Sequence, residues 1–524
     1  YVGIIEKTLN MLVNHHDGLR LRFRYVKVDG GESEYMVRRS TETEGKWIQW
    51  YEHPEKTALP VEVVNLSSVT DDISAFITKR CTDLQYSLNI TDGPVIKTAL
   101  FKNHKDGKDR LFIVIHRLCT DMVSWRIIAE DFCSIYKKLS AGETPVLPDK
   151  TASYRDYSEG LRKYVPEAEK HRDYWLKVFR DYSTNESPGS LFEITDSFSE
   201  TLTPSASVKN YKISLDSYDT ELLLKTVPSA FNTEITDILL SALLLSCNRS
   251  FQISDLLINM EVDGRETFIG DVSRTAGWFN TTFPLRLKSY SLTDYDSLIK
   301  SIKETVRAVP DSGLSYQILK YFSDRKEDFR EDSLPVFTFN YIGDSVLPEN
   351  ELLASEEFFD CSSIYHMNNN LLDIKSFVSD NKLSTVFSGN GHIRSEENLK
   401  DFAHNFIDTL KEIIYHCIKP GRKYFTPSDF PLATVTQSFL DSISDPSSIE
   451  AIYKLSPLQE GFLFHAMSAP DSDHYCTQAS WSYEGELHID ALKEAWNDVF
   501  SAHGAFRTGF IWEKGEEPFQ IVYR

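Results

Sequence analysis

The chain has 524 residues, which is too long for a single hydrophobic core and predicts roughly two to four domains of about 150 residues each. It carries 56 Lys and Arg against 78 Asp and Glu, a net charge of -22, so nucleic acid and anionic membranes are poor partners. The 7 cysteines are scattered without a CxxC pair, and no run of about eighteen apolar residues occurs. We therefore expect a cytoplasmic protein with no disulfide framework, structural metal site or membrane span.

The first segment of the chain is predicted to be a helix followed by a strand. Apolar residues recur at helical spacing over Ile5–Asn14, and the polar run 15–18 ends the pattern. Over Leu19–Tyr25 apolar residues alternate with three arginines, which predicts a strand with one solvent-facing side. The chain lacks a starting Met and enters the helical pattern at once, so we expect it to be a piece of a longer protein.

A hairpin follows, and its second strand leads into the most informative stretch of the chain. Asp106-Gly107 separates strands expected at Val95–Phe101 and Leu111–Ile115. The apolar spacing then becomes helical over Val123–Phe132. Strand-to-helix junctions of this kind are common places for functional side chains in α/β proteins.

Polar side chains are concentrated at this junction. His116, Arg117, Asp121 and Ser124 stand together, with Trp125 next in the chain. A histidine is suited to acid–base chemistry because it titrates near neutral pH. The alternative interpretation is structural, with a hydrogen-bonded core histidine and an aspartate that caps the helix. No GxSxG turn surrounds Ser124, which disfavours a nucleophilic serine.

Helical spacing returns over Tyr154–Arg180, and the Ser-, Asn-, Pro- and Gly-containing residues 181–191 form a candidate linker. A second α/β region then runs to about Cys417, and a Pro-rich linker covers 419–449. The helices and strands expected in that region are helices at Thr236–Cys247 and Leu298–Ala308 and strands at Leu256–Met260 and Phe283–Leu287.

Three further clusters in this region could have functional roles. Glu261–Glu266 follows a predicted strand directly, and its first carboxylate is either a base or a solvated loop charge. Gly277–Phe279 and Phe339–Gly343 combine glycine with aromatic residues. Such pairs usually pack around a turn, and a ligand-binding wall is the alternative.

The end of the chain repeats its beginning. Leu492–Trp512 matches Ile5–Tyr25 in order, with His503 at the place of His16. The repeat predicts the start of a second copy of the first domain. A helical stretch and a strand expected at Thr477–Tyr483 precede this second copy and have no counterpart in the first.

Taken together and in this order, the motifs resemble the condensation-domain superfamily of nonribosomal peptide synthetases, and in particular its epimerization branch. Residues 116–125, HRLCTDMVSW, stand where that family has HHxxxDG followed by VSW, and residues 261–266, EVDGRE, stand for EGHGRE. Residues 277–284, 339–343 and 426–432 match further family motifs.

The resemblance implies an α/β fold of two chloramphenicol-acetyltransferase-like lobes that form a V with a central tunnel. Residues 450–524 resemble the opening of an ordinary condensation domain. The expected domains are an N-terminal lobe at 1–180 that lacks its first strand and helix, a C-terminal lobe at 190–430, a linker at 431–449, and the N-terminal part of a following condensation domain at 450–524.

The resemblance also implies a substrate and partners. An upstream peptidyl carrier protein domain would deliver an aminoacyl or peptidyl thioester on its phosphopantetheine arm, and the domain itself would bind no cofactor or metal. Condensation and adenylation domains are expected downstream in the same synthetase. The implied reaction inverts the Cα of the thioester, which requires a base, an acid and stabilisation of an enolate.

At the two implied catalytic positions, this chain has the family's residue at one and a different residue at the other. Glu261 retains the family's glutamate, but Arg117 occupies the position of the catalytic histidine. A guanidinium has essentially no neutral form with which to accept a proton near pH 7. Met122, Val262 and Asp263 depart from the family pattern as well. We therefore expect an epimerization-type domain whose activity is impaired or lost; the alternatives are an active epimerase that uses Glu261 with another base, and a peptide-bond-forming condensation domain.

The other motif residues receive structural or binding roles from the resemblance. Asp121 is expected to form an ion pair with Arg265 as a possible partner, and Ser124 and Trp125 belong to the same structural motif. His116 is expected to be buried beneath the tunnel. The residues expected to line the tunnel and contact the substrate are Asn340, Tyr341, Trp278 and Phe279.

Overall fold

The structure is a computed structural model that describes residues 1–27, 45–69, 72–180, 203–204, 208–265, 268–289, 291–329, 337–344, 367–368, 371–389, 395–468, 475, 477–512 and 517–524. The candidate linker at 181–191 lies outside these described residues. The chain forms two compact units, the first comprising Tyr1–Leu215, Leu257–Arg286 and Val309–His404 and the second Asp216–Leu256, Leu287–Ala308 and Asn405–Arg524.

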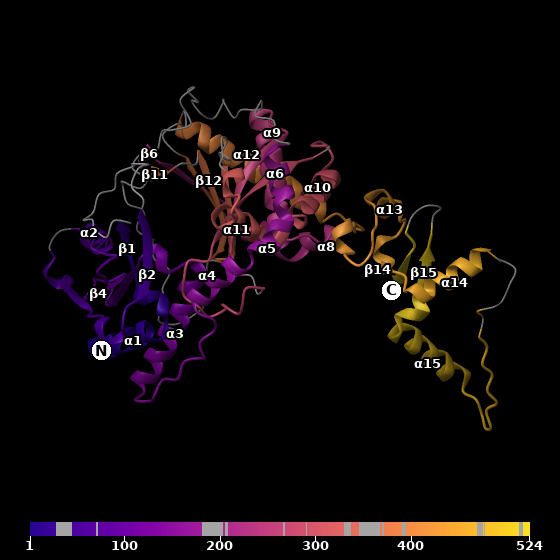
Figure 1. Cartoon of the computed structure of the whole chain (residues 1–524), viewed down its shortest axis with the longest axis horizontal. Coiled ribbons are helices and arrows are strands. Elements are labelled where there is room, and N and C mark those ends of the chain that lie inside the picture. The colour runs from indigo at the N-terminus through magenta and orange to yellow at the C-terminus, as the bar shows by residue number, and fades with distance from the viewer. Residues whose placement is uncertain are drawn as a thin grey trace. The chain divides into compact units, whose positions relative to one another are not determined.

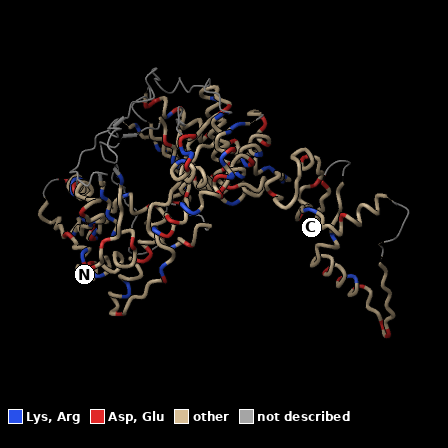
Figure 2. Tube along the Cα trace, in the orientation of Figure 1, with Lys and Arg blue, Asp and Glu red and all other residues tan. Residues whose placement is uncertain are grey.

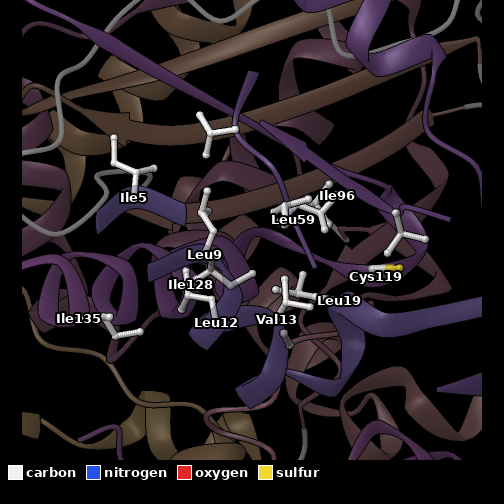
Figure 3. Close-up of a cluster of buried hydrophobic side chains, with 14 of the residues drawn as sticks. Ile5, Leu9, Leu12, Val13, Leu19, Leu59, Ile96, Cys119, Ile128 and Ile135 are labelled. Carbon is white, nitrogen blue, oxygen red and sulfur yellow. The ribbon is translucent and has the colours of Figure 1, made fainter. Parts of the chain in front are cut away.

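Two helices form the core at the start of the first unit. The predicted N-terminal helix is confirmed as α1 (Val2–His15), and it lies beside α3 (Met122–Ser140) in Figure 1. The apolar spacing of α1 places Ile5, Leu9 and Val13 on one buried face. Figure 3 shows these side chains gathered with Ile128 and others around α3. Burial of this face, rather than helix propensity alone, holds α1 in place.

The predicted hairpin is confirmed next to this core. Strands β4 (Ile96–Lys102) and β5 (Arg110–Ile115) pair antiparallel, with Ile96 opposite Ile115. Strand β3 (Glu62–Asn65) completes a three-stranded sheet on the other side of β4. Because β5 lies at the edge of this sheet, most of its residues are only half-buried.

The first predicted strand is confirmed, but its expected solvent-facing side is wrong. Strand β1 (Leu21–Lys27) pairs antiparallel with β2 (Gly45–Tyr51). Arg20 and Arg22, which should face water, are only 7% and 5% exposed. Arg20 Nε donates to the carbonyl oxygen of Val13 at 3.0 Å, and Arg22 also donates to a backbone carbonyl. Arg20 also forms an ion pair with Asp17. The carboxylate and the carbonyl oxygens replace water as partners and offset part of the cost of burying the two cations.

A six-stranded mixed sheet organises the rest of the first unit. Its strand order is β7-β13-β12-β10-β8-β9, with β8, β10 and β12 parallel and β12, β13 and β7 antiparallel. The two strands predicted in this region are confirmed as β8 and β9. The strands are β7 (Lys209–Ser214), β8 (Asp255–Val262), β9 (Thr281–Lys288), β10 (Phe337–Asp344), β12 (Leu372–Ser379) and β13 (Lys382–Gly389).

The helical region predicted before residue 181 is confirmed, although it is broken into three helices. A capping box at Ser153 starts the first of them, because its hydroxyl and the Asp156 carboxylate each accept from the other's backbone N–H. The remaining elements of the first unit are α2 (Ile73–Tyr86), α4 (Tyr154–Lys163), α5 (Val165–Ala168), α6 (Arg172–Arg180), β6 (Thr203–Pro204), α11 (Leu314–Phe322) and β11 (Met367–Asn368).

Helices dominate the second unit before its C-terminal part. Both helices predicted here are confirmed, as α9 and α10. Residues 237–247 of α9 are all buried, so this helix is a core element with little polar surface. The helices are α7 (Ser217–Glu221), α8 (Val227–Phe231), α9 (Ile235–Phe251), α10 (Tyr295–Arg307) and α12 (Glu396–Cys417), the last beginning in the first unit.

The C-terminal part repeats the element order of the N-terminus. Helix α15 (Ile489–Ala502) and strand β15 (Thr508–Ile511) correspond to α1 and β1. The expected strand at Thr477–Tyr483 is wrong, because this stretch is exposed and has no strand conformation. The other elements are α13 (Gln437–Ser442), β14 (Ile449–Lys454), α14 (Pro457–Ser468) and β16 (Phe519–Tyr523), and the three strands pair in the order β14-β16-β15.

Charged residues of both signs are interspersed along the trace (Figure 2). Five described cysteines, at 81, 119, 133, 247 and 417, are buried and free. No single described helix is long and apolar enough to cross a membrane; Ser217–Phe231 and Ile235–Phe251 meet the length and composition limits only as a pair bent by 93°.

Candidate functional site

The junction between β5 and α3 is a short, hydrogen-bonded turn. His116 precedes a 3-10 turn at Arg117–Cys119, and its Nδ1 accepts from the backbone N–H of Leu118 at 3.2 Å. This bond places the ring proton of the neutral imidazole on Nε2. Burial lowers the pKa of His116, because a charged ring is poorly solvated there. The histidine is half-buried and serves as the cap of this turn.

Asp121 begins α3 and is the most heavily bonded carboxylate of the junction. Its Oδ1 accepts from the backbone N–H and the hydroxyl of Ser124, both at 2.7 Å. Arg265 Nη2 lies 2.9 and 3.0 Å from the two carboxylate oxygens, and the backbone N–H of Phe279 donates to Oδ2 at 3.1 Å. The Asp121 side chain is 0% exposed and that of Arg265 only 7%. Arg265, the partner suggested by the sequence, therefore neutralises a buried carboxylate.

Hydrogen bonds of the same cluster hold the loop around residues 277–279 against the start of α3. Gly277 donates its backbone N–H to the Ser124 hydroxyl at 3.1 Å, and Tyr154 donates its hydroxyl to the carbonyl oxygen of Trp278 at 2.8 Å. A Cβ on Gly277 would lie 2.5 Å from the Tyr154 ring, so only glycine allows this approach. The Arg265 guanidinium covers the Phe279 ring at 4.0 Å. The backbone around Trp278 is thus held from both sides.

Arg117 packs against this loop through Trp278. Its guanidinium carbon lies 4.3 Å from the centre of the Trp278 ring, a cation–π contact. Arg117 is exposed, and Trp278 is half-buried. No ion pair links Arg117 to a carboxylate within the described part of the chain. Arg117 is therefore a stacked, solvent-accessible cation without an ion-pair partner among the described residues.

Glu261 lies near the end of β8, where the sheet supplies its neighbours. Its Oε1 accepts from Asn280 Nδ2 at 2.7 Å. The parallel pairing of β8 and β10 puts Asn340 directly opposite Glu261, so these two side chains share one face of the sheet. Tyr341 falls on the other face by strand alternation. Asn340 is 8% exposed, whereas Glu261 is half-buried.

One short segment connects the two motifs. Trp278 supports Arg117, the N–H of Phe279 binds Asp121, and Asn280 binds Glu261. The Cα atoms of residues 278 and 280 can be at most about 7 Å apart. The structure therefore brings Arg117 and Glu261 to the two ends of a three-residue segment. No sequence signal singled out Asn280, although it lies inside one of the recognised motifs.

The structure places four other motif residues as follows. Phe279 is 3% exposed and packs with Tyr157 and Val272, so its ring supports the loop from inside. Trp125 is half-buried against the core around α1 and α3. Ser124 is fully buried and bonded to Asp121 and Gly277, which leaves its hydroxyl without access to a substrate. Met122, which replaces the family's glycine, is 49% exposed.

One described cluster has the residue types of a metal site. The ligand atoms of His15, His16 and Asp131 lie within 4.8 Å of one another. His16 Nε2 is already hydrogen-bonded to Asp131 Oδ2 at 2.9 Å, and Arg274 Nη2 lies 2.5 Å from Asp131 Oδ1. The guanidinium supplies the positive charge that a metal would bring, so we interpret this cluster as a buried ion-pair network.

Comparison with known proteins identifies the family. The model of the condensation-domain family matches residues 2–434 and 449–524. The chain belongs to the condensation-domain family. The second match begins at 449, where the sheet of β14, β16 and β15 begins as well. The α/β fold class expected from the sequence is confirmed.

Curated relatives of this condensation-domain chain match it over nearly its whole length. One component of the linear gramicidin synthase of Brevibacillus parabrevis is 31% identical over 99% of the chain, and bacitracin synthase 3 of Bacillus licheniformis is 30% identical over 100%. The chain spans only 7% and 8% of the length of these two relatives.

Two solved structures show what the chain is similar to in fold. The epimerization domain from the third module of tyrocidine synthetase B is 26% identical, with a TM-score of 0.67 over 80% of this chain and 89% of that one. The first condensation domain of the calcium-dependent antibiotic synthetase, at 16% identity and a TM-score of 0.56, covers 80% of this chain and 90% of that one and shows the shared fold.

Proposed function

We propose that this chain is an epimerization-type domain of a nonribosomal peptide synthetase that receives a carrier-bound aminoacyl or peptidyl thioester and is impaired in inverting its Cα. The proposal is supported by the family membership, by the likeness to an epimerization domain, and by the motif residues gathered around Trp278. The carrier would be a peptidyl carrier protein domain upstream in the same cytoplasmic synthetase, with condensation and adenylation domains downstream. The phosphopantetheine arm belongs to that carrier.

The proposed impairment is supported above all by the side chain at position 117, which is a guanidinium stacked on Trp278. Inversion needs one group that removes the Cα proton and another that delivers a proton to the opposite face. Glu261 can fill one position, because its carboxylate is half-buried and oriented by Asn280. The guanidinium of Arg117, stacked on Trp278, cannot alternate between protonation states near neutral pH. Its positive charge can still stabilise an enolate oxygen.

A stereochemical assay tests this proposal. A carrier protein is loaded with an L-aminoacyl group, incubated with the chain, and the released amino acid is separated by chiral chromatography. We expect no D-amino acid above the level obtained with Glu261→Gln. Formation of D-product by the unaltered chain would overturn the impairment and favour an epimerase that uses Glu261 with a second base.

Two variants test whether one position limits inversion. Arg117→His restores a titratable ring at the family's position, and D-product should appear if this position alone is limiting. Little recovery would indicate that Met122 and Asp263 limit inversion too. Arg126→His is the matched control, because Arg126 is an exposed arginine on the helix that follows and should leave the result unchanged.

Peptide-bond formation is the alternative function, and the name of the matching family favours it. It requires two loaded carriers, one for the donor and one for the acceptor. Amide product formed with both carriers by the unaltered chain, and absent in Arg117→Gln, would support condensation at this site.

A further inference from the structure

We propose that this site catalyses one half of an epimerization: Glu261 removes the Cα proton of a thioester and returns a solvent-derived proton to the same face. One enantiomer of the substrate then exchanges its Cα hydrogen without inversion. This inference rests on the proposed function and names the reaction that the impaired site retains.

The first observation is that Glu261 is available and fixed. Asn280 Nδ2 donates to its Oε1 at 2.7 Å, and no cation is bound to the carboxylate in the described part of the chain. Its second oxygen keeps its lone pairs for a proton. Asn280 itself stands at the start of β9, beside β8 in the sheet, so two paired strands fix the geometry. A carboxylate held in this way can act repeatedly on one face of a bound carbon.

The second observation is that the other acid–base side chains near this site are hydrogen-bonded or buried. His116 Nδ1 accepts from the Leu118 N–H, which leaves its other nitrogen protonated. Cys119 is 0% exposed, and Tyr154 donates its hydroxyl proton to the carbonyl oxygen of Trp278. Burial raises the pKa of both groups to about 12, so neither is present near neutral pH as a thiolate or phenolate that could remove a proton. Asp121 is fully covered by its bonds to Arg265 and its neighbours. Hydrogen bonds or burial thus occupy each of these four side chains, and none of them is a second base for the opposite face among the described residues.

The third observation is the fixed positive charge of Arg117. The guanidinium carbon of Arg117 lies 4.3 Å from the centre of the Trp278 ring, and Tyr154 donates its hydroxyl to the carbonyl oxygen of Trp278. A preorganised cation lowers the energy of a developing oxyanion without having to reorient. Arg117 therefore suits the enolate oxygen, and the absence of a carboxylate partner in the described residues leaves its charge available.

The chemical step is balanced by these groups and water alone. The Cα–H bond breaks, its proton forms an O–H bond with Glu261, and its electron pair moves into the thioester carbonyl to give an enolate. The carboxylic acid of Glu261 then exchanges its proton with water. The return of this proton to Cα restores the thioester and the carboxylate.

A single base has a stereochemical consequence. In one configuration the Cα–H bond points toward Glu261 when the thioester and side chain are bound, and in the other configuration it points away. Only the first configuration can exchange, and it keeps its configuration because the proton returns to the face it left. An inverting enzyme, by contrast, exchanges both enantiomers and interconverts them.

The test uses aminoacyl pantetheine thioesters in deuterated water. The L and D forms of the alanyl, leucyl, phenylalanyl and glutamyl thioesters are incubated separately with the chain, then hydrolysed and examined by mass spectrometry and chiral chromatography. We expect deuterium at Cα in one configuration only, with that configuration retained. Glu261→Gln should reduce the label to the uncatalysed level.

Asn280 serves as a positioning residue in this inference, and its variants separate orientation from folding. Asn280→Ala should lower the exchange rate about tenfold, the effect of one lost hydrogen bond to a charged group, while thioester binding stays unchanged. Asn280→Gln keeps an amide donor and should recover part of the rate. Asn103→Ala removes an exposed asparagine of the same unit as the matched control.

The outcomes distinguish this inference from the proposed function. Label no higher than in Glu261→Gln, for both forms of all four thioesters, would overturn the one-base exchange and leave the proposed impairment standing. Label accompanied by inversion would overturn both. Label in both configurations without inversion would show that protons reach both faces, and would overturn the assignment of Glu261 as the single base.

Discussion

Replacing Asp121 by alanine should destabilise the first unit strongly, because the buried Arg265 would keep only the longer, 3.6 Å contact to Asp263, whose side chain is 46% exposed. Arg265, whose side chain is 7% exposed, would lose both contacts to the carboxylate, and Ser124 and Phe279 would lose an acceptor for their backbone N–H groups. Removing one member of a buried ion pair typically costs about 3–5 kcal/mol. The hydrogen bonds to the carboxylate, at about 1.5–3 kcal/mol each before non-additivity, are consistent with this size.

Urea unfolding followed by tryptophan fluorescence measures the effect as a change in the free energy of unfolding. The double variant Asp121→Ala/Arg265→Met should be less destabilised than the sum of the single variants by about 1–3 kcal/mol, because the uncompensated charge is gone. Glu159→Ala is the control: its 2.8 Å pair with Arg155 is 49% and 72% exposed, and its loss should cost at most about 1 kcal/mol. If Asp121→Ala cost no more than this control, the ion pair would not hold the loop to α3.

Two further predictions concern the same unit. Gly277→Ala should lower the free energy of unfolding by about 1–3 kcal/mol, because the new Cβ would lie 2.5 Å from the Tyr154 ring, and an unchanged urea midpoint would contradict this close approach. A hydrogen bond from Arg172 lowers the pKa of Glu169 from 4.5 to about 2, so the stability it contributes is present above pH 4.5 and is lost as the pH falls toward 2. Melting temperatures over this range should depend less on pH in Glu169→Gln than in the unaltered chain, and equal slopes would argue against the shift.

Much of the secondary structure could be predicted because its signals are local. The spacing of Ile5, Leu9 and Leu12 requires only that one helix face be buried, and α1 forms over that pattern. The alternation around Thr477–Tyr483 satisfied the same kind of local rule, yet no strand forms there. A strand needs a pairing partner, and alternation alone does not specify one.

The sequence predicted which motif residues belong to the candidate site, but not the contacts between them. The order of the motifs identified the family, and the resemblance predicted that Arg117 and Glu261 stand at its two catalytic positions. The contact between Glu261 and Asn280 was not predictable, because it depends on the register of β8 beside β9. The burial of Arg20 was missed because two of its partners, the carbonyl oxygens of Val13 and Glu52, are backbone groups that no motif marks, and its ion pair with Asp17 lies inside a polar stretch predicted only to end the helix.

The sequence by itself determined which side chains are present, and the resemblance predicted their roles: Glu261 as a catalytic carboxylate, Arg117 where a histidine is expected, and Asp121 with Arg265 as a possible partner. Only the tertiary structure decided how these groups meet. Asp121 and Arg265 are separated by 144 positions, yet their bond and that of Phe279 hold the segment 278–280 between Arg117 and Glu261. Side-chain identity is a property of single positions, whereas orientation and access depend on contacts between strands and helices far apart in the chain.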